Sequence, residues 1–268
     1  YPAVATNIKV SIANPSANTF TVTVENLAAS NTPLAPGVFV ITGGNDPLFT
    51  AGTADFGNGL EGVAEDGAAA TLGASAEGNA GLVSPLAPGA YAVHSEAVGP
   101  IFSANVADKG QGLEGVAEDG AAANLGTSLE AITTLTANGV FNTPVGASAA
   151  GPAFPGDSYS FSFTANKGDR LSLATMFVQS NDLFFSPGET GIALWSGDNP
   201  ISGDITSQFQ LWDSGTEVNQ FPGAGADQAP RQSGPNVGAA ENGVVQLVSD
   251  AYTYPNVSDV IRVSISLQ

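Results

Sequence analysis

Apolar and polar residues alternate along several short stretches of this chain, and the alternation restricts the fold more than any other feature. The clearest examples are Ile8–Ile12, Phe20–Val24, Tyr159–Phe163 and Val263–Leu267. A period of two places apolar side chains on one face of a β-strand and polar side chains on the other. Leu171–Val178 and Gly191–Trp195 are more continuously apolar, as buried strands are. With 33 Gly and 17 Pro to form turns, the pattern predicts an all-β fold, an antiparallel β-sandwich.

An internal repeat lies in the first half of the chain. Residues 59–70, Gly-Leu-Glu-Gly-Val-Ala-Glu-Asp-Gly-Ala-Ala-Ala, return unchanged as residues 112–123. Pro-Leu-Ala-Pro-Gly also occurs twice, so the copies span 33–84 and 85–131. Leu60 and Val63 have the spacing of one helix face, and Gly67 is a typical helix stop. Two copies are too few for a solenoid. We therefore expect a duplicated hairpin with a short helix, inserted into a single domain of residues 1–268.

The charge and the residue types exclude several classes of function. There are 25 acidic and 6 basic residues, which gives a net charge of −19. Such a field repels the phosphates of nucleic acids and anionic lipid headgroups, and it attracts cations. The chain has no cysteine, which excludes disulfides, thiolate metal sites and cysteine nucleophiles. The charge leads us to expect no nucleic-acid partner. No stretch is apolar for 18 residues, so we expect no membrane span.

Two short acidic motifs are the strongest functional signal. Ser180–Phe185 and Leu211–Asn219 each place carboxylates among glycine, amide and aromatic residues at a predicted strand end. Acidic side chains gathered at one end of a sandwich repel one another unless a cation lies between them. Calcium takes six to eight oxygen ligands and suits such a group. The alternative is that these aspartates only cap turns. Zinc does not fit a chain with no cysteine and one histidine.

These motifs resemble the spondin domain, the N-terminal module of F-spondin and mindin, and in particular its secreted bacterial and archaeal relatives. The most specific segments are Ala174–Phe184 and Leu211–Glu217, although the resemblance covers most of the chain. It implies a C2-like β-sandwich that binds one calcium ion. It also implies a secreted protein, located outside the cell or at its surface, and a chain that starts at Tyr1 without methionine is what processing of such a protein would leave.

The resemblance assigns the calcium ligands residue by residue. They are Asp182 in the first motif and Asp213 and Glu217 in the second. Leu183 stands where the family has an aromatic residue, and Glu217 is one methylene longer than the usual aspartate. These departures affect the expected geometry of the site. Asn181 and Asn219 are candidates to add an amide oxygen or to orient a ligand.

The repeated segment carries two further acidic groups, and three interpretations of them stay open. Glu61, Glu65 and Asp66 form the first, and Glu114, Glu118 and Asp119 form the second. They could bind additional calcium, or act as paired carboxylates in glycoside hydrolysis. The interpretation that we favour is a solvated helix face.

Two other features bear on the site. His94 is the only histidine, and we expect a surface residue at a strand end rather than a catalytic base. The long polar loop at 218–243 directly follows the second motif and could wrap the metal end of the domain.

The sequence therefore predicts a non-enzymatic, calcium-binding β-sandwich that acts in extracellular or cell-surface recognition or adhesion. Its ligand would be an extracellular protein or a glycan. The alternative is a structural subunit of an extracellular filament or matrix that self-assembles, with Tyr1–Ile12 donated as a strand to a neighbouring sheet. A hydrolase is the weakest hypothesis, because the sequence offers no credible nucleophile or general base.

Overall fold

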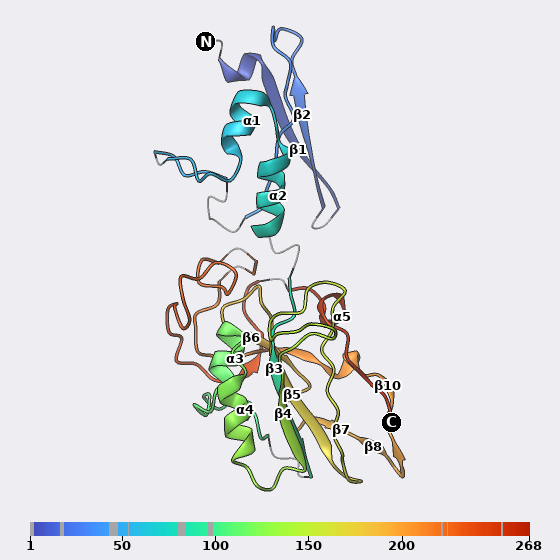
Figure 1. Cartoon of the computed structure of the whole chain (residues 1–268). Coiled ribbons are helices and arrows are strands. Elements are labelled where there is room, and N and C mark those ends of the chain that lie inside the picture. Colours follow the sequence, from blue (N-terminus) through green and yellow to red (C-terminus); the bar gives the residue numbers. More distant parts are fainter. Residues whose placement is uncertain are drawn as a thin grey trace. The chain divides into compact units, whose positions relative to one another are not determined.

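The computed structural model describes residues 3–16, 19–42, 48–52, 54–79, 84–95, 99–220, 222–223, 225–252 and 254–268. Its contacts divide the chain into two compact units (Figure 1). The first comprises Tyr1–Val40 and Pro47–Ser75, and the second comprises Ile41–Asp46 and Ala76–Gln268. The expectation of a single domain with the repeat as an insertion differs from this division, because the repeated helical segments fall in different units.

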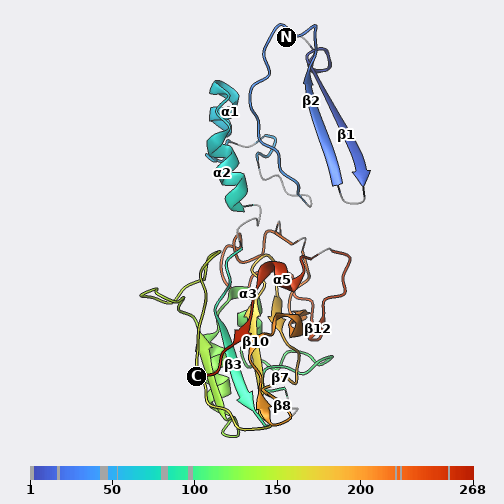
Figure 2. The same cartoon turned by 90° about the vertical axis from the view of Figure 1, so that its right-hand side faces the viewer.

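The first unit contains a β-hairpin and two short helices. The alternating stretches near the N-terminus form antiparallel strands, in which Val10 pairs with Val24. Gly59 and Gly67 flank the first helix with positive φ angles of 104° and 65°, as the predicted glycine stop requires. Figure 2 shows the two helices following one another along the chain. The elements are η1 (Val4–Thr6), β1 (Ile8–Ser16), β2 (Thr19–Asn26), α1 (Leu60–Asp66) and α2 (Ala70–Asn79).

The second unit is built on a seven-stranded sheet in the order β12-β11-β6-β5-β3-β4, with β7 also paired to β5. All of its pairs are antiparallel. The strands are β3 (Gly89–His94), β4 (Ala137–Phe141), β5 (Arg170–Met176), β6 (Leu183–Ser186), β7 (Ile192–Ala193), β11 (Gln210–Asp213) and β12 (Gln246–Leu247). The prediction of a buried strand at Leu171–Val178 is confirmed by β5.

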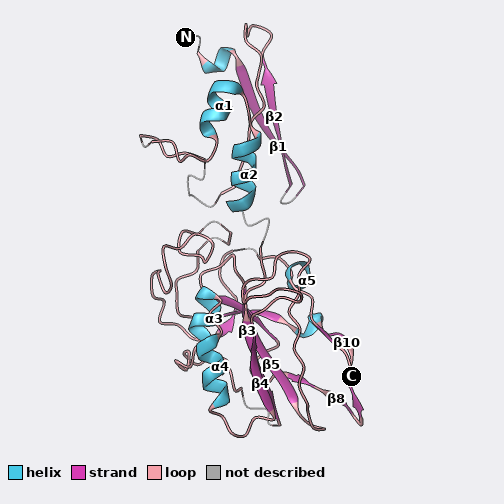
Figure 3. Cartoon of the chain, in the orientation of Figure 1, coloured by secondary structure: helices cyan, strands magenta, loops and turns pink. Residues whose placement is uncertain are grey.

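Shorter elements complete this unit (Figure 3). Two pairs of two-residue strands lie outside the main sheet, β8 with β9 and β10 with β13. Their bounds are β8 (Trp195–Ser196), β9 (Asn199–Pro200), β10 (Gly203–Asp204) and β13 (Ser264–Ile265). The helices are α3 (Leu113–Asp119), α4 (Ala123–Glu130), η2 (Thr206–Gln208) and α5 (Val257–Val260). Among the described residues, none of the helices has both the length and the hydropathy needed to cross a membrane.

The strand predicted at Tyr159–Phe163 is wrong, because this segment has no strand pairing. Its alternation has another physical cause. The aromatic side chains pack against the sheet, and the ring of Phe161 stacks on Tyr91 with centroids 4.1 Å apart. One side of an extended segment can therefore be apolar without a backbone ladder. The strand predicted at Val263–Leu267 is shorter than expected, since only Ser264 and Ile265 pair.

The two faces of the sheet are covered differently. Helices α3 and α4 cover one face, where Leu113 and Leu125 pack with Ala90 and Ala92 of β3. On the other face, Tyr91 and the remaining apolar side chains of the sheet pack against coil segments and the short strands. The antiparallel β-architecture is confirmed. The two-sheet, C2-like sandwich stays a prediction.

Candidate metal centre

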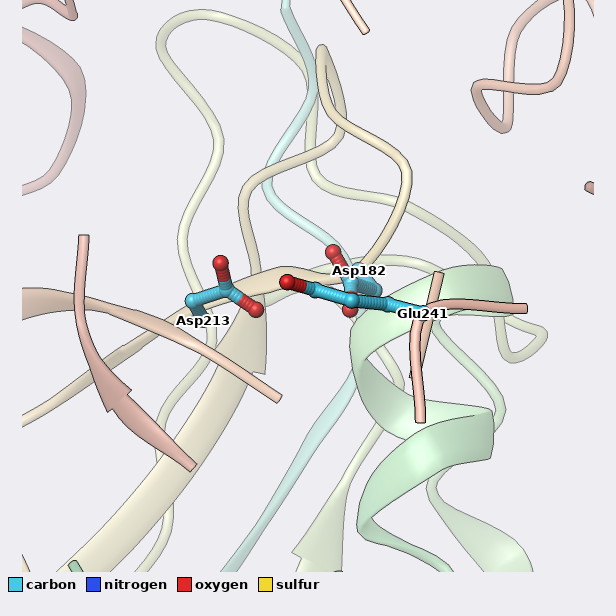
Figure 4. Close-up of side chains that lie close together, drawn as sticks. All are labelled: Asp182, Asp213 and Glu241. Carbon is cyan, nitrogen blue, oxygen red and sulfur yellow. The ribbon is translucent and has the colours of Figure 1, made fainter. Parts of the chain in front are cut away.

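The ends of two neighbouring strands bring the acidic motifs together. Asp182 immediately precedes β6 and Asp213 is the last residue of β11. The antiparallel register pairs Asp213 with Leu183, so the two aspartates become neighbours. Glu241 approaches from the coil before β12. One carboxylate oxygen from each of Asp182, Asp213 and Glu241 lies within 4.8 Å of the others (Figure 4).

Asp182 has two carboxylate oxygens in opposite situations. Its Oδ2 accepts hydrogen bonds from the backbone amides of Thr216 (2.9 Å) and Glu217 (3.0 Å) and from the hydroxyls of Ser214 (3.0 Å) and Thr216 (3.2 Å). Its Oδ1 is buried and accepts no hydrogen bond from the described residues. The side chain is 0 % exposed, and burial raises its pKa. A buried oxygen that accepts no hydrogen bond needs another partner, and an ion is one that can fill this role.

Asp213 is oriented by the turn that follows β11. The Gly215 amide donates to its Oδ1 at 2.7 Å, and the amide of Asn219 donates to its Oδ2 at 2.7 Å. Burial and then the charge of Asp182 raise the pKa of Asp213 to about 7. Gly215 has φ of 71°, and a Cβ there would lie 2.5 Å from the Val244 nitrogen. The turn therefore needs glycine, and the orienting role considered for Asn219 is the one that the hydrogen bond supports.

Glu217 lies next to Asp182 but outside the group of three. Its Oε2 accepts a hydrogen bond from Asn181 at 3.3 Å, so Asn181 orients it. Burial raises its pKa to about 7, the Asn181 bond opposes this, and the charge of Asp182 adds to it. A Cβ on Gly238 would lie 2.4 Å from the same oxygen. The structure thus brings Asp182 and Asp213 together as predicted, with Glu217 beside them.

Glu241 is the residue that the sequence interpretation did not select. It belongs to the loop at 218–243, which folds back on the second motif through an isolated bridge between Glu217 and Ala240. The Glu241 amide then donates to the Thr216 carbonyl at 2.9 Å. Burial and the charge of Asp182 raise its pKa. The sequence signal that pointed to this part of the site was the position of the loop directly after the second acidic motif.

Glu118 corrects the interpretation of the repeat as a solvated helix face. In the second copy its side chain is only 2 % exposed, and neither carboxylate oxygen has a hydrogen-bond partner among the described residues. Burial raises its pKa to about 7, and the charges of Glu217, Glu114 and Asp182 add to this. In the first copy the counterpart Glu65 is exposed, as expected.

Among the described residues, no basic side chain forms an ion pair with these carboxylates. The ion pairs recorded in the described part of the chain join Lys167 to Asp198 and Arg262 to Asp204, away from the acidic group. The acidic group therefore offers several oxygen ligands with no cation of its own. Hard divalent cations prefer such ligands, and the unpartnered Asp182 Oδ1 shows that the site fits a metal ion.

His94 differs from its prediction. It ends β3, as expected of a strand-end residue, but it is buried rather than at the surface. Its Nε2 lies 2.9 Å from the Ser172 hydroxyl oxygen, and Ser172 is buried as well. The pair therefore lies within the core of the sheet.

Comparisons with known proteins found no matching family model, no matching curated protein and no matching solved structure. The resemblance to the spondin domain therefore rests on the two acidic segments and stays a prediction.

Proposed function

We propose that this protein binds one calcium ion through Asp182, Asp213 and Glu241, with Glu217 beside them. The observation that carries this proposal is Asp182 Oδ1, which accepts no hydrogen bond from the described residues although Asp182 is 0 % exposed. An ion at this oxygen would offset the repulsion among carboxylates whose pKa values burial has raised.

The ligand chemistry favours calcium over other metals. The available ligand atoms are carboxylate oxygens with irregular spacing, and calcium accepts six to eight oxygens in flexible geometry. Glu241 is exposed, so that side of the site can supply water ligands. Asn181 and Asn219 would hold Glu217 and Asp213 in place, as supporting residues do around metal ions.

The proposed role of the ion is to fasten a loop. Asp182 precedes β6 and Asp213 ends β11, whereas Glu241 belongs to the long polar loop, so one ion would join this end of the sheet to the loop. The loop would then present a fixed surface for an extracellular protein or a glycan. This function is non-enzymatic recognition or adhesion by a secreted protein of spondin type, as the sequence resemblance implies.

Thermal unfolding in calcium and in chelator tests the proposal. Asp213→Asn should lower the midpoint in calcium but not in chelator, because its main role is to hold the ion. Asp204→Asn is the matched control, since Asp204 is an exposed aspartate with an ion pair at the surface. Equal losses for Asp213→Asn in both conditions would overturn the proposal.

A further inference from the structure

The two copies of the repeat have the same local structure. Gly59 and Gly112 precede the helices α1 and α3 with φ of 104° and 105°. Gly67 and Gly120 end them with φ of 65° and 64°. A second short helix follows in each copy. The repeated sequence therefore folds in the same way in both units.

In the second copy, the strand that precedes the helices is paired along both of its edges. That strand is β3, with β5 on one edge and β4 on the other. Ala90 and Ala92 face the helices, and Tyr91 and Val93 face the other side of the sheet. All of β3 is buried.

The first copy has the corresponding segment without a sheet. Residues 37–41 align with the start of β3, and the same alternation is visible. Val38 and Val40 are half-buried, and a Cβ on Gly73 of α2 would lie 3.8 Å from the Val38 Cγ2 atom. Phe39 and Ile41, on the other side, are each 86 % exposed. Residues 37–41 make no backbone hydrogen bond with the rest of the described chain.

One strand of the second unit has an open edge that suits this segment. β4 is the end strand of its sheet and pairs only with β3. Within the described residues, Ala137–Phe141 make no other backbone hydrogen bond. β4 already pairs with a strand of this repeat type along one edge. The opposite edge at the far end of the sheet is β12, which has only two residues.

We propose that residues 37–41 pair with the free edge of β4 in a second copy of this chain. Pairing antiparallel to β4 would make the new strand parallel to β3, with Val38 and Val40 on the helix side. The first copy would then repeat the second along the sheet. Two strand spacings are about 9.6 Å, close to the width of about 10 Å that one helix needs. Helices α1 and α2 would therefore pack beside α3 and α4 without a clash.

The absence of charged residues in both strands favours this pairing. Neither residues 37–41 nor Ala137–Phe141 include a charged residue, although the chain has a net charge of −19. Pairing them buries no charge. Donor and acceptor are different surfaces, so the contact is head-to-tail and can continue from one chain to the next. Residues 37–41 are a different segment from Tyr1–Ile12, in which residues from Ile8 onward already pair with β2 along one edge, and Tyr1 and Pro2 lie outside the described residues.

Sedimentation velocity of the full chain over a range of concentrations tests this proposal. We expect the mean mass of the unchanged chain to rise with concentration, and Phe39→Lys to remain monomeric. Ile12→Lys is the matched control, because Ile12 is 68 % exposed on a strand of the same unit. It should associate like the unchanged chain. A monomer at every concentration, or equal loss of association in both variants, would overturn the proposal.

Disulfide trapping gives a second readout, because the chain has no cysteine of its own. In this pairing residue 41 lies opposite residue 137, so Ile41→Cys in one preparation and Ala137→Cys in another should form mixed disulfides in excess of either homodimer. Random proportions of the three dimers would contradict the pairing. Both experiments are repeated in chelator, where association should persist because neither strand contains a metal ligand. Association that depends on calcium would contradict strand pairing while leaving the calcium proposal intact.

Discussion

The two copies of the repeated segment have identical sequences at 59–70 and 112–123, yet they lie in different surroundings. In the second copy α3 packs on a complete sheet, and Glu118 is buried beside the acidic group. In the first copy the described residues 37–41, which correspond to the start of β3, are not paired in a sheet, and Glu65 is exposed. The local sequence therefore determines the helix and its glycine ends. The neighbouring sheet determines burial, and burial determines what each glutamate can do.

The largest expected difference between the copies is in core packing. Leu113→Ala removes a fully buried side chain and should lower the free energy of unfolding by about 2–5 kcal/mol. Leu60→Ala, the same change in the first copy, affects a half-buried residue and should cost less than about 1 kcal/mol. Urea denaturation measures both. Similar losses would show that the first copy has a complete core in solution.

The next difference concerns calcium. Glu118→Gln should weaken calcium binding by about 10-fold, as the loss of a supporting charge near a metal does. In chelator at pH 8 it should raise the melting temperature, since a buried charge without a partner is removed. Glu65→Gln should change neither quantity. Calorimetric titration and thermal unfolding measure the two effects, and equal behaviour of the two variants would contradict the assigned environments.

The acidic site should also make stability depend on pH. The pKa values of Glu118, Asp213 and Glu217 are raised to about 7, so these groups hold protons more tightly in the folded chain. Their contribution favours folding at low pH and is lost as the pH rises from about 4 through 7. In chelator the melting temperature should fall by about 5 °C or more between pH 5 and pH 8. Calcium should remove most of this fall, and a rise with pH in chelator would contradict the raised pKa values.

The smallest effects should be equal in the two copies, because they are local. Gly67 and Gly120 have the same positive φ, and a Cβ on either would lie 3.0 Å from the side chain of Ala35 or Ala87. Alanine at either position should therefore cost about 1 kcal/mol. Urea denaturation of the two variants measures this, and a clear difference between them would mean that the helix ends are not determined locally.

Part of the fold could be predicted from local patterns. Alternation identified β1 and β2, a long apolar stretch identified β5, and glycine spacing identified the end of α1. The strand predicted at Tyr159–Phe163 failed because aromatic packing onto a sheet produces the same alternation as pairing. The division into two units could not be predicted, because two identical sequences do not indicate which copy packs on a sheet.

In the candidate site, too, local patterns predicted some residues and not others. Asp182 and Asp213 could be identified because each lies at the end of a strand within a short motif. Glu241 could not, because it reaches the site only through the bridge between Glu217 and Ala240. The burial of Glu118 could not be predicted either, since its sequence neighbours are the same as those of Glu65.

Calorimetric titration of the full chain with calcium, beside Asp182→Asn, tests the central claim most directly. The unchanged chain should bind one ion, and Asp182→Asn should lose binding by 100-fold or more, on the order of 2.7 kcal/mol, because it replaces the oxygen that has no other partner. Absence of binding to the unchanged chain, or the same affinity in a folded Asp182→Asn variant, would contradict the account.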